Sequence, residues 1–183
     1  ERCTLNIGFM SVRIHLMPLP RTKPVSILSF VLEKLYLDEG ISGGKKVNIV
    51  LHLINGCLVI WLFSLLLAYV GTPAYRWLAL LAGSAWLLSP LYVSTVLYVV
   101  QRMAMLATFF MLAACISYFY WRLSLIKGKF GLVLLLMVFV FMVLAVFAKE
   151  PAIVLVPVLL LMESLWFQFS GPGDKPVRWL RAL

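Results

Sequence analysis

The sequence predicts an all-α, polytopic membrane helix bundle of about five transmembrane helices, with one amphipathic helix at the membrane interface. Hydrophobic residues make up 63% of the 183 residues and charged residues only 13%, and the mean hydropathy is +1.02. Several apolar runs approach or exceed the roughly twenty residues that cross a bilayer. Helices are expected because open strands cannot satisfy their backbone hydrogen bonds in lipid.

Residues 1–46 are expected to form a loop fragment outside the membrane that contains an interfacial helix over 24–37. Pro24 opens this helix, Gly40 follows its end, and one face is apolar. That face carries Val25, Leu28, Val31, Leu32, Leu35 and Tyr36. A helix of this kind lies flat on a membrane; the alternative is a packed helix of an extramembrane domain. Because the chain begins at Glu1 in irregular polar sequence, we expect it to be a fragment of a longer protein.

Residues 47–169 are expected to form the five-span bundle, and residues 170–183 a basic cytoplasmic tail or loop. Pro90 is expected to break the second span, because proline removes a backbone hydrogen bond. Pro151 suits the first turn of the fifth span. The candidate spans are 47–70, 77–100, 103–121, 130–148 and 152–169.

The basic residues indicate the orientation and the partners of the chain. If the spans alternate, one side receives most of the lysine and arginine of the short loops and is expected to be cytoplasmic. The basic residues there are Arg76, Arg122, Lys127, Lys129, Lys175, Arg178 and Arg181. The net charge of +9 comes from residues at the ends of apolar runs. Membrane lipid, not nucleic acid, is therefore the expected partner.

A candidate phosphate-binding site lies on the opposite, non-cytoplasmic face. Gln101 and Arg102 stand between two apolar runs, and an intramembrane cation is a functional-site hypothesis by default. Asn48, His52 and Asn55 share one helical stripe. The topology gathers Lys23, Asn48, His52, Gln101, Arg102, Lys149 and Glu150 at this face. A lipid phosphate or diphosphate is bound well by such a set: arginine and lysine pair with its charge, and neutral amides donate hydrogen bonds to its remaining oxygens.

Each of these side chains also has a structural interpretation. Arg102 and Lys149 would then extend to the lipid headgroups, and Glu150 would only neutralise Lys149. The polar stripe would supply interhelical hydrogen bonds, above all through Asn55. Glu163 has no assigned role, and the spacings of Cys3, Cys57 and Cys115 do not indicate a metal site.

Several short motifs support a family resemblance that runs from about Lys23 to Glu163. They are Lys23-Pro24 with the residues to Phe30, His52 to Asn55, Ser89-Pro90, Val99 to Met103, and Ala148-Lys149-Glu150. In this order they resemble bacterial polytopic proteins of the C-type (GT-C) glycosyltransferase superfamily. Their closest named relatives are the transmembrane and tetratricopeptide-repeat O-mannosyltransferases.

The resemblance implies transfer of a sugar from a polyprenyl-phosphate donor to a protein or glycan hydroxyl. It places the protein in the bacterial inner membrane with the site on the periplasmic side. The catalytic acid of such enzymes lies in an early external loop; before Glu33 the only acid here is Glu1. We therefore expect that acid upstream and the fragment alone to be inactive; a divalent metal stays undetermined. Lys23-Pro24 stands where the family has Arg-Pro, and Ser94 stands at an acidic position.

Three functions remain open at this point. The first is a membrane glycosyltransferase, favoured by the cationic cavity and the order of the motifs. The second is a transporter or flippase of a lipid-linked substrate, which paired broken helices would favour; Pro90 supplies one break. The third is a non-catalytic assembly subunit, favoured if Arg102 and Lys149 only face headgroups.

Overall fold

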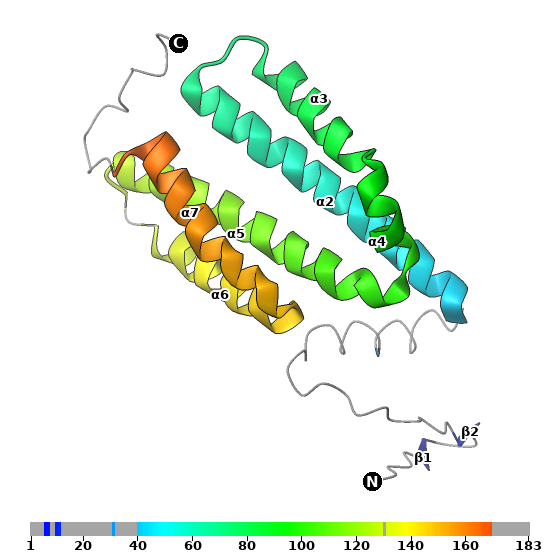
Figure 1. Cartoon of the computed structure of the whole chain (residues 1–183). Coiled ribbons are helices and arrows are strands. Elements are labelled where there is room, and N and C mark those ends of the chain that lie inside the picture. The colour runs from blue at the N-terminus through cyan, green and yellow to red at the C-terminus, as the bar shows by residue number, and fades with distance from the viewer. Residues whose placement is uncertain (1–5, 8–9, 12–30, 32–39, 130, 170–183) are drawn as a thin grey trace.

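The computed structural model describes residues 6–7, 10–11, 31, 40–129 and 131–169 (Figure 1). Nearly all of these residues are helical, which confirms the predicted all-α class. Two strands of two residues each, β1 (Asn6–Ile7) and β2 (Met10–Ser11), pair antiparallel. The predicted interfacial helix over 24–37 lies outside the described residues except for Val31, as do Lys23 and the tail 170–183.

Five longer helices and five short helical segments make up the bundle (Figure 1). The longer helices are α2 (Gly40–Val70), α3 (Tyr75–Leu87), α5 (Arg102–Ile126), α6 (Leu132–Ala148) and α7 (Leu155–Met162). Between α3 and α5 lie η1 (Pro90–Tyr92), α4 (Val93–Leu97) and η2 (Val99–Gln101). Two segments flank α7: the 3-10 turn η3 (Glu150–Val154) and the π-helical turn η4 (Glu163–Phe167).

Within the described residues, three helices are long and apolar enough to cross a membrane: Gly44–Val70, Arg102–Ile126 and Glu150–Phe167. The bent pair Tyr75–Leu87 and Pro90–Leu97 makes a fourth if it counts as one span. The remaining predicted span corresponds to α6, whose 17 residues give a length of about 25 Å at the usual helical rise. That falls short of a hydrocarbon core of about 30 Å. The structure therefore contains helices that can span a membrane, and the total of five spans stays a prediction.

The helix boundaries differ most from the predicted ones at two places. Helix α2 begins at Gly40 instead of 47, because the exposed side chains of Lys45 and Lys46 allow the helix to continue beyond the apolar stretch. Helix α5 continues to Ile126 instead of 121. Its additional turn contains Arg122, which is buried among neighbouring helices.

The break at Pro90 lies where the sequence predicts it. Helix α3 ends at Leu87, η1 begins at Pro90, and the two pieces meet at an angle of 43°. Proline has no N–H to offer the carbonyl of Trp86. The N–H of Ser89 donates to that carbonyl instead, at 3.3 Å. The chain then passes through α4 and η2 and turns into α5 (Figure 1).

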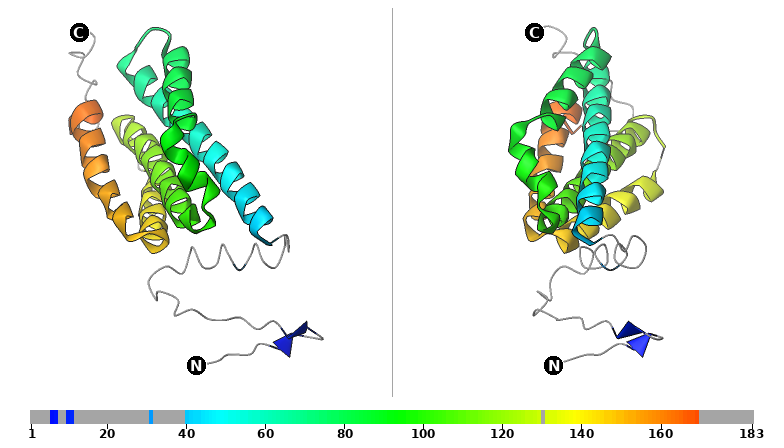
Figure 2. Two further views of the ribbon diagram at one scale, coloured as in Figure 1. Left: turned by 45° about the vertical axis from the view of Figure 1, so that its right-hand side comes forward. Right: turned by 90° about the vertical axis from the view of Figure 1, so that its right-hand side faces the viewer.

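The bundle consists of the α2–α3 hairpin packed beside α5, α6 and α7 (Figure 2). Small residues allow the hairpin to pack closely. A Cβ atom at Gly56 would lie 2.2 Å from Leu87 Cδ1, and one at Gly83 2.2 Å from Ile60 Cγ1. The larger apolar core lies between α2, α5 and the α7–η4 segment. It contains Leu66, Ala114, Cys115, Phe119, Leu155, Met162 and Phe167.

Candidate functional site

Arg102 anchors the first turn of α5 inside the bundle. Its side chain is 0% exposed. Its Nε donates a hydrogen bond to Asn48 Oδ1 at 3.2 Å, and its Nη2 donates to the carbonyl of Gly44 at 3.2 Å. Arg102 therefore points toward Asn48, as predicted. The alternative in which Arg102 extends to the headgroups is wrong.

Asn48 joins α2 to the chain that follows the break. Its Nδ2 donates to the carbonyls of Val96 at 3.1 Å and Tyr98 at 3.2 Å. Because α4 ends at Leu97, carbonyls of its last turn lack partners within the helix. The buried amide of Asn48 thus donates to one such carbonyl, that of Val96, while its Oδ1 accepts from Arg102.

His52 and Asn55 also reach backbone carbonyls, His52 at the break and Asn55 in α5. His52 Nε2 lies 3.1 Å from the carbonyl of Leu87, the last residue of α3. Its ring stacks on Trp86 with centroids 5.3 Å apart. Asn55 Nδ2 donates to the carbonyl of Met105 in α5 at 3.0 Å. The predicted stripe exists, and each of its three members contacts a backbone carbonyl of another segment.

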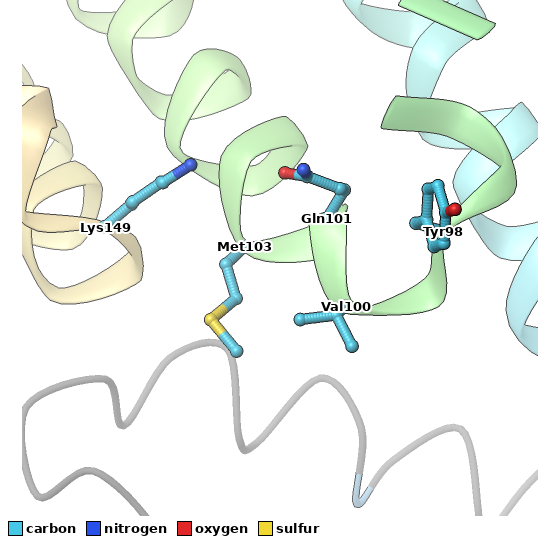
Figure 3. A pocket seen from close by; sticks show the side chains of 5 residues that line it. All are labelled: Tyr98, Val100, Gln101, Met103 and Lys149. Atoms are coloured by element: carbon cyan, nitrogen blue, oxygen red, sulfur yellow. The ribbon is translucent and has the colours of Figure 1, made fainter. Parts of the chain in front are cut away.

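A pocket of about 480 Å³ opens where η2 meets the junction of α6 and η3. It is lined by Tyr98, Val100, Gln101, Met103 and Lys149. Lys149 has extended backbone between α6 and η3, with φ −157° and ψ 126°, so the chain turns a corner there. In Figure 3 the side chains of Gln101 and Lys149 point toward each other from either side of the first turn of α5. The mouth therefore combines an ammonium group and an amide with apolar walls.

The structure brings together only part of the predicted phosphate site. Gln101 and Lys149 share the pocket, and Arg102 follows Gln101 directly but is buried behind it. Glu150 is exposed at the start of η3 and is not among the pocket's lining residues. His52 is held by Leu87 and the aromatic rings of the break.

A second polar cluster, at the other end of α5, was missed by the sequence prediction. Arg122 Nη2 lies 2.5 Å from Glu163 Oε1, and the Tyr118 hydroxyl donates to Glu163 Oε2 at 2.5 Å. The Arg122 guanidinium also lies over the ring of Phe167, 5.4 Å from its centroid. Glu163, to which the sequence assigned no role, is therefore an internal partner. Its position as a lone acid in an apolar run was the available signal, because such a charge requires a partner.

Among residues 40–129 and 131–169, no three His, Cys, Asp or Glu side chains gather as metal ligands would. No family model, no curated protein and no solved structure matches the chain. The class of the protein therefore follows from its fold and its polar sites alone. It is a helical membrane protein with a broken helix, a lysine–amide pocket at one end and a buried ion pair at the other.

Proposed function

We propose that the chain is part of a GT-C-type membrane glycosyltransferase and binds the phosphate of a polyprenyl-linked sugar at the Gln101–Lys149 pocket. The observation that carries this proposal is the shared pocket of these two side chains, which come from different elements. Both belong to the motifs on which the family resemblance rests. An apolar pocket with a few convergent polar groups is the usual form of a site for an amphipathic ligand.

Each lining residue has a part in this proposal. The Lys149 ammonium supplies a point charge for a phosphate oxygen, and the Gln101 amide donates to another. Val100 and Met103 offer apolar surface to the first isoprenoid units. Arg102 acts as a positioning residue, since its hydrogen bonds to Asn48 and Gly44 fix the turn that carries Gln101.

The proposed reaction follows from this placement. The acceptor hydroxyl attacks the sugar's anomeric carbon while the bond to the donor phosphate breaks, and the leaving phosphate gains negative charge. Lys149 stabilises that charge. In this proposal the hydroxyl proton passes to a carboxylate that is not among the residues the structure describes. Five spans, the bacterial inner membrane and a periplasmic site belong to the same proposal.

Replacement of Lys149 tests the proposal. Lys149→Gln, in the chain reconstituted in lipid nanodiscs, should weaken the binding of a polyprenyl phosphate about tenfold, because a charge-assisted contact is lost. Lys129→Gln is the matched control, since Lys129 is exposed in the α5–α6 turn at the other end. Equal binding by both variants and the unaltered chain would overturn the site.

A second readout addresses the chemistry. Transfer of a radiolabelled sugar from the polyprenyl-linked donor is followed in membranes that express the longer protein of which the chain is expected to be a fragment. Transfer that Lys149→Gln abolishes and Lys129→Gln leaves intact supports the glycosyltransferase. Donor binding accompanied by movement of the lipid between leaflets, without sugar transfer, would replace the proposal with a transporter.

A further inference from the structure

A second pocket of about 450 Å³ lies between α5, α6 and the α7–η4 segment. Its polar part is formed by Trp121, Arg122 and Glu163, near the end of α5 that is opposite to Arg102. Its apolar wall includes Val156, Leu159 and Leu160 of α7. The pocket is therefore polar at one end and apolar along its length. We refer to it below as the α7 groove.

The α7 groove can be reached from the side of the bundle. Val156, Leu159, Leu160 and Glu163 are spaced i, i+3, i+4 and i+7, so they follow one face of the helix. Val156 is 43% and Leu160 59% exposed. In a membrane-spanning helix such exposed aliphatic residues face lipid. An acyl chain from the surrounding bilayer therefore has direct access to this wall.

The charges around the polar end favour an anionic headgroup. Both carboxylate oxygens of Glu163 already accept hydrogen bonds, one from Arg122 and one from Tyr118. The exposed Lys127 and Lys129 follow in the turn at the end of α5. Residues 40–129 and 131–169 contain two acidic residues, Glu150 and Glu163. Glu150 lies at the other end of α7, so Glu163 is the acid at this end. Basic pockets between membrane helices are typical binding sites for anionic lipid headgroups.

An unused hydrogen-bond donor gives independent support. The indole Nε1 of Trp121 is buried and has no hydrogen-bond partner within the part of the chain that the structure describes. Buried donors normally find an acceptor. Trp121 lines the α7 groove, so a phosphate or ester oxygen of a lipid bound there is a candidate acceptor for this donor.

We propose that the α7 groove binds one anionic phospholipid from the leaflet at the Arg122 end of the bundle. One acyl chain lies along Val156, Leu159 and Leu160. The headgroup lies near Trp121 and Arg122, within reach of the lysine-bearing turn. This site is at the opposite end of α5 from the Gln101–Lys149 pocket and does not depend on the proposed sugar transfer.

The test is native mass spectrometry of the purified chain, equilibrated with equal amounts of phosphatidylglycerol and phosphatidylcholine. The chain should retain one phosphatidylglycerol with about fivefold preference, as expected for about one basic side chain at a membrane surface. Leu160→Trp, which fills the groove, should remove that lipid. Leu161→Trp is the matched control, because Leu161 is 57% exposed on the same helix but does not line the groove.

Three results would overturn the proposal: no retained lipid, equal retention of the two phospholipids, or equal loss in the two leucine variants. A polyprenyl phosphate that displaces phosphatidylglycerol from the groove would also overturn it, because the groove would then belong to the sugar donor. If Leu160→Trp does not fold, Val156→Phe repeats the test. Its control is Val154→Phe, because Val154 is 52% exposed and lies outside the groove.

Discussion

The two ends of α5 each bury an arginine, and they hold it differently. The hydrogen bonds described for Arg102 go to an amide oxygen and a backbone carbonyl of α2. Arg122 lies against the carboxylate of Glu163 and the ring of Phe167. The Arg102 end thus supports an irregular turn, whereas the Arg122 end fastens one membrane helix to another through opposite charges.

This difference predicts different energetic consequences at the two ends. Removing one member of a buried ion pair leaves a charge without compensation, which costs several kcal/mol. Removing a donor from a neutral acceptor costs less, because only the desolvation of that acceptor is uncompensated. Substitutions that remove one group at a time therefore test this difference in unfolding free energy.

The largest effect is expected for Glu163→Ala. It should lower the free energy of unfolding by about 3–5 kcal/mol, because Arg122 stays buried without its carboxylate. Arg122→Met combined with Glu163→Leu should recover most of that loss, since both charges are then absent. Equilibrium unfolding in detergent micelles measures both. A single variant as stable as the double variant would show that the pair does not fasten the helices.

A smaller loss is expected for Arg102→Met, about 1–3 kcal/mol, because the acceptors at Asn48 and Gly44 lose their donor. Arg102→Lys should restore only part of it, since the planar fork that reaches both oxygens is gone. Gln101→Met is the control, because Gln101 is exposed and such a change is usually worth under about 0.5 kcal/mol. Equal losses at positions 101 and 102, measured by the same unfolding assay, would contradict the anchoring role.

Within the polar stripe of α2, Asn48→Ala should cost more than Asn55→Ala. Asn48 donates to two carbonyls and accepts from Arg102. Asn55 donates to one carbonyl, and its Oδ1 has no hydrogen-bond partner among the described residues. Asn55→Ala should cost about 0.6 kcal/mol, the usual value for one polar contact in a membrane, and Asn48→Ala at least twice as much. The reverse order in thermal melting would refute this ranking.

Local chemistry explains what could be predicted from the sequence. The break follows from the missing N–H of Pro90, and the shared stripe of Asn48, His52 and Asn55 follows from helical spacing. Their acceptors could not be predicted, because the carbonyls of Leu87, Val96 and Tyr98 become available only where the chain bends. Backbone acceptors leave no signal in a sequence.

The pairings across the bundle are harder to predict for a different reason. Arg122 and Glu163 meet across α5 and η4, and their pairing depends on how α7 packs after the corner at Lys149. The sequence placed both near the same membrane face but did not join them. The sequence predicted that Gln101 and Lys149 lie at the same end of the bundle. The full set of residues that line their pocket could be identified only from the fold.

Cysteine labelling in sealed membrane vesicles tests most directly whether the two ends of α5 face opposite sides of the membrane. In a chain whose own cysteines are replaced by alanine, Gln101→Cys, Lys149→Cys and Lys127→Cys are each treated with an impermeant maleimide. Positions 101 and 149, which line one pocket, should react from the same side, and position 127, beyond the end of α5, only from the other. Labelling of 149 from the side of 127 would contradict the shared pocket, and labelling of 101 and 127 from one side would contradict a membrane-spanning α5.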